Sequence, residues 1–173
     1  MTPPRIQATL EGTDRRSIGR SDEVTQLVLK QPKRFRELIK CLWNESPVVR
    51  MRAADAAEKV SAQKPGLLDR HKPELLGLLA ETEQIELRWH LAAMVPRLRL
   101  NAPERQRAAD ALQRYLEDRS SIVKTFALQG LADLAQNDAA LRPKVKQLLE
   151  DAIQSGTPAM KARARKLLKT HQP

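Results

Sequence analysis

The sequence has little of what most catalytic and metal sites are built from. Of its 173 residues, one is cysteine and three are histidine, and aromatic residues make up only 3%. A single cysteine, Cys41, excludes both an intrachain disulfide framework and a zinc site made of several cysteines. The histidines His71, His90 and His171 are scattered along the chain and give no basis for a metal centre. We therefore expect no metal and no other cofactor.

Long apolar runs are also missing. No stretch approaches the roughly 18 apolar residues that a membrane-spanning helix needs. The first residues, Met-Thr-Pro-Pro-Arg, do not resemble the apolar region of a secretory signal, so we expect a cytoplasmic protein without membrane insertion. The six glycines never cluster into a phosphate-binding loop, and no grouping of nucleophile and base stands out. We therefore expect no enzymatic activity.

What remains is an aliphatic, alanine-rich chain that is typical of closely packed helices. Hydrophobic residues make up 41% of the sequence, and no segment alternates for long enough to predict a strand. Residues 1–20 show no hydrophobic period and hold four arginines, so we expect a flexible basic arm there and a single domain over 21–173. A short helix is predicted from Ser21 to the break at Pro32. Further helices are predicted over 33–44, 47–62, 69–81, 84–99, 103–117, 120–136, 140–154 and 157–170.

One five-residue pattern recurs along the predicted helices. It reads VRMRA from Val49, LRWHL from Leu87, VKTFA from Val123 and MKARA from Met160, so the copies start 36 to 38 residues apart. Each copy begins with an apolar residue, continues with an arginine or lysine, and has a second apolar residue four positions after the first. This spacing places one apolar stripe on one helix face. Four antiparallel helix pairs at this period predict a stacked all-α solenoid, with a kink at Pro96 near Met94.

The recurring pattern resembles the HEAT repeat, and the resemblance covers about residues 32–170. It implies an α-α superhelix in which the second helix of each pair lines a concave face, and it implies a binding scaffold. In this family an acid about six residues before the conserved base often joins a ladder of hydrogen bonds between repeats. The corresponding positions are Asn44, Thr82, Asp118 and Ser155, of which one is acidic, so we expect a partial ladder.

Residues at equal offsets within the four copies are expected to form columns on the concave face. The candidates for contacting a protein partner are Arg52, Lys59, Trp89, His90 and Arg97. A competing interpretation is that Trp89 packs between adjacent repeats and that His90 is a solvated surface residue. Our leading hypothesis is a monomeric, non-catalytic scaffold that binds an unknown protein partner through this face. Phe35, Cys41, Trp43 and Phe126 are expected to be packing residues.

The positive charge of the chain suggests an alternative to the protein-binding scaffold. The chain carries a net charge of +10, and residues 156–173 hold five bases and no acid. These bases, which could follow a phosphate backbone, are Lys161, Arg163, Arg165, Lys166 and Lys169. The alternative function is therefore nonspecific nucleic-acid binding through a basic concave face and a basic C-terminal helix. The competing interpretation is a terminal cap whose outer face must be polar. The scarcity of aromatic residues disfavours recognition by base stacking.

Overall fold

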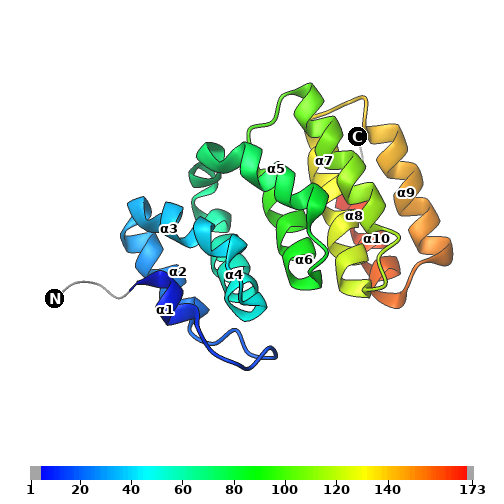
Figure 1. The fold of residues 1–173 in the computed structure, drawn as a ribbon. Helices are drawn as coiled ribbons and strands as arrows, with labels where there is room; N and C mark the ends of the chain where they lie inside the picture. The colour runs from blue at the N-terminus through cyan, green and yellow to red at the C-terminus, as the bar shows by residue number, and fades with distance from the viewer. Residues whose placement is uncertain (1–4, 171–173) are drawn as a thin grey trace. The chain divides into compact units, whose positions relative to one another are not determined.

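A computed structural model describes residues 5–170 of the chain. Within this range the structure is all-α, without a strand, which confirms the predicted fold class (Figure 1). The α-helices are α1 (Ile6–Leu10), α2 (Ser21–Lys30), α3 (Phe35–Lys40), α4 (Pro47–Gln63), α5 (Lys72–Glu81), α6 (Ile85–Met94), α7 (Ala102–Tyr115), α8 (Ser121–Gln136), α9 (Arg142–Ser155) and α10 (Pro158–Thr170).

The helices begin and end close to the predicted positions, with differences at two proline-containing segments. The predicted helix over 33–44 is divided, because 3-10 turns at Pro32–Arg34 and Cys41–Trp43 flank α3. The kink predicted at Pro96 is confirmed, since α6 ends at Met94 and a 3-10 turn continues over Val95–Arg97. A proline has no backbone N–H to continue the α-helical hydrogen bonding, so the helix tightens there.

The chain forms two compact units, one up to Lys72 and one from Pro73 onward. This division differs from the predicted single domain over 21–173. The predicted flexible arm is also wrong for residues 5–20. Ile6 and Leu10 of α1 are fully buried, and α1 packs against α2, α3 and α4. Residues 1–4 lie outside the described range. The arm belongs to the first unit because its two apolar side chains are buried there.

In the first unit, α4 is the central helix, and α1, α2 and α3 pack against it (Figure 1). Ser46 begins α4 by accepting a hydrogen bond from the backbone N–H of Val49 at 3.4 Å. Small side chains on α4 let the neighbouring helices approach closely. Four of them are fully buried, namely Ala53, Ala54, Ala56 and Ala57.

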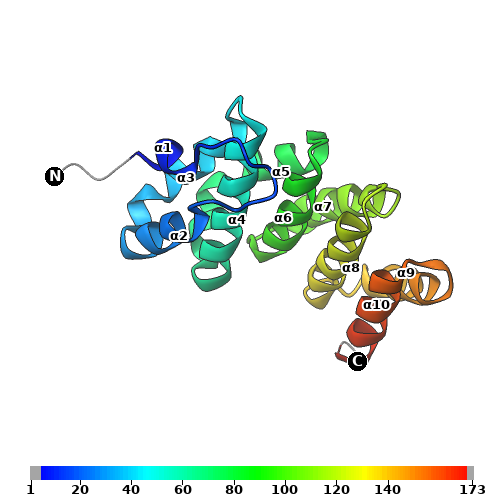
Figure 2. The ribbon, with the colours of Figure 1, turned by 90° about the horizontal axis from the view of Figure 1, so that it is seen from below.

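In the second unit, the helices form two rows. Helices α6, α8 and α10 pack successively against one another, while α7 and α9 pack on α8 and α10 from the other side (Figure 2). The Tyr115 hydroxyl of α7 donates to the carbonyl oxygen of Leu79 in α5. This bond joins the first helices of two successive helix pairs. The second unit therefore has the stacked helix pairs that the recurring pattern predicts.

A recurring set of polar contacts precedes the second helices. The side chains of Asn44, Thr82 and Asp118 each accept a hydrogen bond from the backbone N–H two residues later. Arg50 donates to the carbonyl oxygen of Asn44 at 2.7 Å, and Arg88 donates to that of Thr82 at 2.8 Å. These bonds give the bases of the recurring pattern at the start of α4 and α6 the same structural role.

One of these positions also links successive helix pairs. Arg88 Nη1 lies 2.6 Å from Asp118 Oδ2, and the Asp118 side chain is only 2% exposed. Burial raises the pKa of Asp118, but the N–H of Ser120 and the guanidinium of Arg88 outweigh it and lower the pKa overall. The other ladder positions, Asn44, Thr82 and Ser155, make bonds close to themselves in sequence. The ladder is partial, as expected.

Replacing Gly130→Ala should destabilise the protein. A Cβ at this position of α8 would lie 2.7 Å from the Ala92 carbonyl oxygen and 2.9 Å from the Leu112 side chain, so α6 and α8 would have to separate. We expect the free energy of unfolding to fall by about 1–3 kcal/mol in urea titrations. Gly77→Ala is the control. No atom lies within 4 Å of its added methyl group, and removing a helix glycine should stabilise by about 0.5–1 kcal/mol. Equal effects of the two variants would refute this account of α8.

Asp118→Asn should destabilise the protein in a pH-dependent way. Asparagine retains the acceptor for Ser120 N–H and loses the charge that faces Arg88, at an expected cost of about 1–3 kcal/mol at pH 7. The folded-state pKa of Asp118 is lower than the unfolded value. The contribution is therefore complete above about pH 4 and is lost as the pH falls through the folded pKa. Urea titrations from neutral to acidic pH should show the two proteins converging.

The control for this experiment is Asp110→Asn, on the exposed face of α7, where the carboxylate accepts a hydrogen bond from Gln106. We expect a change below about 0.5 kcal/mol for this variant at every pH. A difference between wild type and Asp118→Asn that stays constant into the acidic range would contradict the assignment.

Candidate binding surface

Arg52, predicted to contact a partner, is instead enclosed by its own chain. The residue is 5% exposed, and its guanidinium donates to four backbone carbonyl oxygens at 2.7–3.1 Å. These carbonyls belong to Leu10, Glu11, Asp14 and Ser17. The segment that follows α1 thus folds over α4 and satisfies a buried cation with main-chain oxygens. The prediction that Arg52 faces a partner is wrong, because its donors are used internally.

Two glycines allow this segment to close over Arg52. Gly12 has φ of 149° and Gly19 has φ of 55°, both in the region that favours glycine. A Cβ would also lie 2.5 Å from the guanidinium at Gly12 and 2.6 Å from it at Gly19. The only sequence signal for this arrangement was the presence of glycines in a segment without hydrophobic period.

Lys59 is also engaged within the first unit. Its ammonium group lies 2.7 Å from carboxylate oxygens of both Asp22 and Asp55. The Ser21 hydroxyl donates to the same Asp55 oxygen, so this cluster joins the start of α2 to α4. Burial lowers the pKa of Lys59, but the bonds to the two aspartates outweigh it and raise the pKa overall. Lys59 therefore connects two helices, which differs from the predicted partner contact.

In the second unit, Trp89 and His90 lie on α6. His90 is only 2% exposed, so neither a partner contact nor a solvated surface position fits it. Trp89 is half-buried, with its ring centroid 3.5 Å from that of His90 and 5.2 Å from that of Phe126 on α8. The interpretation that Trp89 packs between adjacent helix pairs is confirmed. Arg97 is half-buried in the 3-10 turn after α6.

Phe126 continues this row of side chains toward α10. The guanidinium carbon of Arg163 lies 5.8 Å from the centre of the Phe126 ring, at a distance typical of a cation–π contact. Arg163 also donates to Gln129 of α8 at 2.8 Å. The packing role expected for Phe126 is confirmed, and the ring also contacts one of the predicted basic residues.

The basic residues of α10 differ in exposure. Arg165, Lys166 and Lys169 are exposed, whereas Lys161 and Arg163 are half-buried. The opposite side of α10 packs in the interior through Met160, Ala164 and Leu167. Within residues 5–170, the three exposed bases and Lys161 form no ion pair. The outward side of α10 is thus a cationic face, which we define as Arg165, Lys166 and Lys169.

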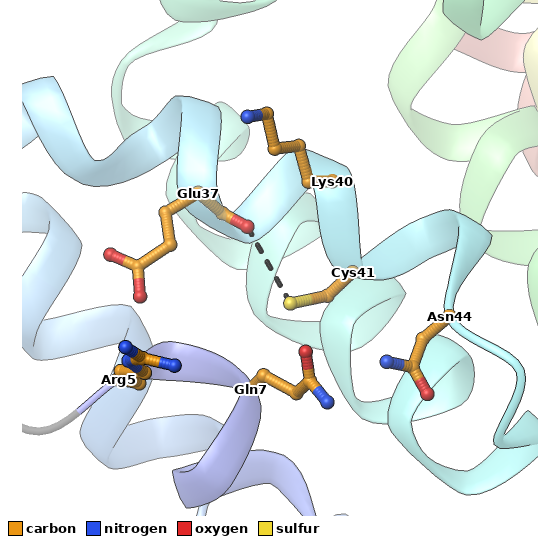
Figure 3. A pocket seen from close by; sticks show the side chains of 6 residues that line it. All are labelled: Arg5, Gln7, Glu37, Lys40, Cys41 and Asn44. Carbon is orange, nitrogen blue, oxygen red and sulfur yellow. Dashed lines mark hydrogen bonds between the residues drawn. The ribbon is translucent and has the colours of Figure 1, made fainter.

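A small hollow of about 330 Å³ lies beside α1 and α3 in the first unit (Figure 3). Glu37 within it is already bound by the N–H of Ile6 at 2.7 Å and by Arg34. Burial and the nearby Glu37 carboxylate raise the pKa of the Cys41 thiol to about 11, so it is protonated at neutral pH and a poor nucleophile. The hollow is lined by Arg5, Gln7, Glu37, Lys40, Cys41 and Asn44.

Two further packing predictions can be compared here. Cys41 and Phe35 are buried, as predicted. Trp43 is not a core residue, since it is 49% exposed at the end of a 3-10 turn. The turn directs this side chain outward because α3 has already ended before it.

Comparison with known proteins adds no assignment: no protein-family model matches the chain, and no curated protein matches it significantly. Among residues 5–170, no three His, Cys, Asp or Glu side chains are grouped so that they could hold a metal ion. In the same range, no helix is long and apolar enough to cross a membrane.

Arg52→Met should release the segment between α1 and α2. Methionine retains most of the apolar stem and removes all four carbonyl contacts, so Arg15 and Arg16, already exposed, should become more accessible to trypsin. We expect cleavage there to accelerate on the order of tenfold, as measured by mass spectrometry of timed digests. The matched control is Arg36→Met on the exposed side of α3, which should digest like wild type. Identical digestion of both variants would contradict this role of Arg52.

Proposed function

We propose that the protein is a non-catalytic, HEAT-like binding module whose α10 contacts the phosphate backbone of a nucleic acid. The observation that carries this proposal is the cationic face of α10, whose three exposed bases form no ion pair within the described residues and lie on a helix without any acid. A phosphate backbone is the polyanion that such a face neutralises with release of counterions. The net charge of +10 would also attract such a partner over a distance.

The need for a polar outer face at the last helix does not by itself explain why α10 has bases and no acid. The exposed side of α7 in the same unit is also polar, but it mixes Arg107 and Arg114 with Asp110. A polar cap needs hydration only, and both signs of charge provide it equally well. The exclusion of acids from α10 favours a role for the positive charge. A membrane surface is disfavoured because the apolar side chains of α10 are already buried.

A protein partner on the α6 and α8 surface is the second candidate function. It is supported by the half-buried Trp89 and by Arg97, which remain at the surface, whereas Arg52 and His90 are buried and Lys59 binds two aspartates. Half-buried aromatic residues are common anchors of protein interfaces. This candidate retains the scaffold function that the resemblance to HEAT repeats implies.

Reversing the cationic face should abolish most nucleic-acid binding. The test is fluorescence anisotropy of a labelled DNA duplex titrated with wild type and with the Arg165→Glu, Lys166→Glu, Lys169→Glu triple variant. Wild type should bind with a micromolar dissociation constant at about 50 mM salt and much more weakly at about 200 mM. In the triple variant the slope of log affinity against log salt should be smaller by about three, one unit for each lost phosphate contact.

The control carries the same change in net charge elsewhere. Lys30, Lys33 and Arg36 are exposed bases of the first unit, and the triple glutamate variant at these positions should keep most of the affinity. Circular dichroism would verify that both variants fold. Equal losses in the two triple variants would show that net charge alone drives binding, and an unchanged affinity in the α10 variant would refute the proposal.

A further inference from the structure

Arg163 differs from the other bases of α10 because neighbouring side chains hold its guanidinium in place. Its Nη1 donates to Gln129 Oε1 at 2.8 Å, and its guanidinium lies over the Phe126 ring. The Gln129 amide is oriented in turn, because its Nε2 donates to Asp133 at 2.9 Å and leaves Oε1 directed at Arg163. Two side chains of α8 thus position one guanidinium of α10 from two sides.

These contacts leave one edge of the guanidinium available. Arg163 makes its protein hydrogen bond through Nη1, so the edge formed by Nε and Nη2 has no partner within residues 5–170. The same edge binds two oxyanion oxygens elsewhere in this protein. Arg20 donates through Nε and Nη2 to the two oxygens of Glu23 at 2.9 and 2.8 Å. Two parallel donors of this kind match two oxygens of a phosphate group.

We infer that Arg163 is the specific phosphate-binding residue of this protein and that it binds one phosphodiester through its Nε–Nη2 edge. Phe126 and Gln129 are its positioning residues. Lys166 lies three positions later on α10, on the same side, and would neutralise the same phosphate or the next one. This inference rests on the proposed function and names the residue that supplies its geometry.

The physical advantage of this arrangement is that most of the ordering has occurred before binding. An exposed arginine or lysine loses side-chain entropy when a phosphate immobilises it. Arg163 is already held by a hydrogen bond and a ring contact, so a phosphate meets a guanidinium in a defined orientation. Arg165, Lys166 and Lys169 supply charge without such contacts. The site therefore combines one oriented donor pair with several mobile cations.

The decisive variant is Arg163→Lys, which keeps the charge and removes the paired donors. We expect its affinity for the labelled DNA duplex to fall about tenfold, the loss of a charge-assisted hydrogen bond, with an unchanged salt slope. Arg107→Lys is the matched control in the same unit, because Arg107 is an exposed arginine of α7 outside the cationic face, and this variant should bind within about twofold of wild type. Thermal unfolding would be compared so that a loss of fold is recognised.

The positioning role is tested by a double-mutant cycle. Phe126→Leu should weaken duplex binding severalfold when Arg163 is present and should have little effect in the Arg163→Lys background. A purely structural role of Phe126 would give the same loss in both backgrounds and would overturn its assignment as a positioning residue.

The remaining outcomes separate this inference from the proposed function. If Arg163→Lys and Arg107→Lys bind equally, Arg163 has no special role, even when the α10 triple glutamate variant loses binding. If wild type does not bind the duplex at low salt, both proposals fail. Tighter binding to vesicles of anionic phospholipid or to polyglutamate than to the duplex would also overturn the assignment to nucleic acid.

Discussion

The close approach of the second helices is the constraint on which the rest of the structure depends. Gly130 places the backbone of α8 against the Ala92 carbonyl of α6, and buried alanines give α4 a similarly small surface. When backbones approach this closely, the helices can stack only in a narrow range of registers. Side chains near the start of neighbouring helices in the second unit then meet one another, with Trp89 two positions and Phe126 and Arg163 three positions after their pattern starts. This packing produces the row of side chains formed by Trp89, Phe126 and Arg163.

Basic residues serve two different purposes in this protein. In the first unit, Arg52 binds backbone carbonyls and Lys59 binds carboxylates of the same unit, so their charge contributes to internal cohesion. In the second unit, Arg88 likewise pairs with Asp118 across successive helix pairs. The cationic face of α10 has no such internal partners in the described range. This contrast, more than the total charge, separates bases that hold the fold together from bases that are available to a partner.

Sequence reasoning was most successful where the relevant interaction is local. Helix positions and the tightened end of α6 at Pro96 depend on residues within a few positions or on the apolar stripe. Prediction from the sequence fails at the residues that lie three positions after the first residue of each copy of the recurring pattern. Arg52, His90, Phe126 and Arg163 have equivalent places in the sequence pattern, yet their surroundings differ. What covers each of them comes from segments distant in sequence.

The all-α class, the order of the helices and the group of bases without acids at the C-terminal helix follow from the sequence, because periodicity and composition act through local geometry. Which bases are engaged within the protein and which are exposed depends on how the helices pack together. The glycine-bearing segment after α1 enclosed Arg52, and Asp22 with Asp55 bound Lys59. Phe126 and Gln129 oriented Arg163. Each of these results depends on contacts between residues more than 30 positions apart or between separate helices, and such contacts form only when the packed helices bring those residues together.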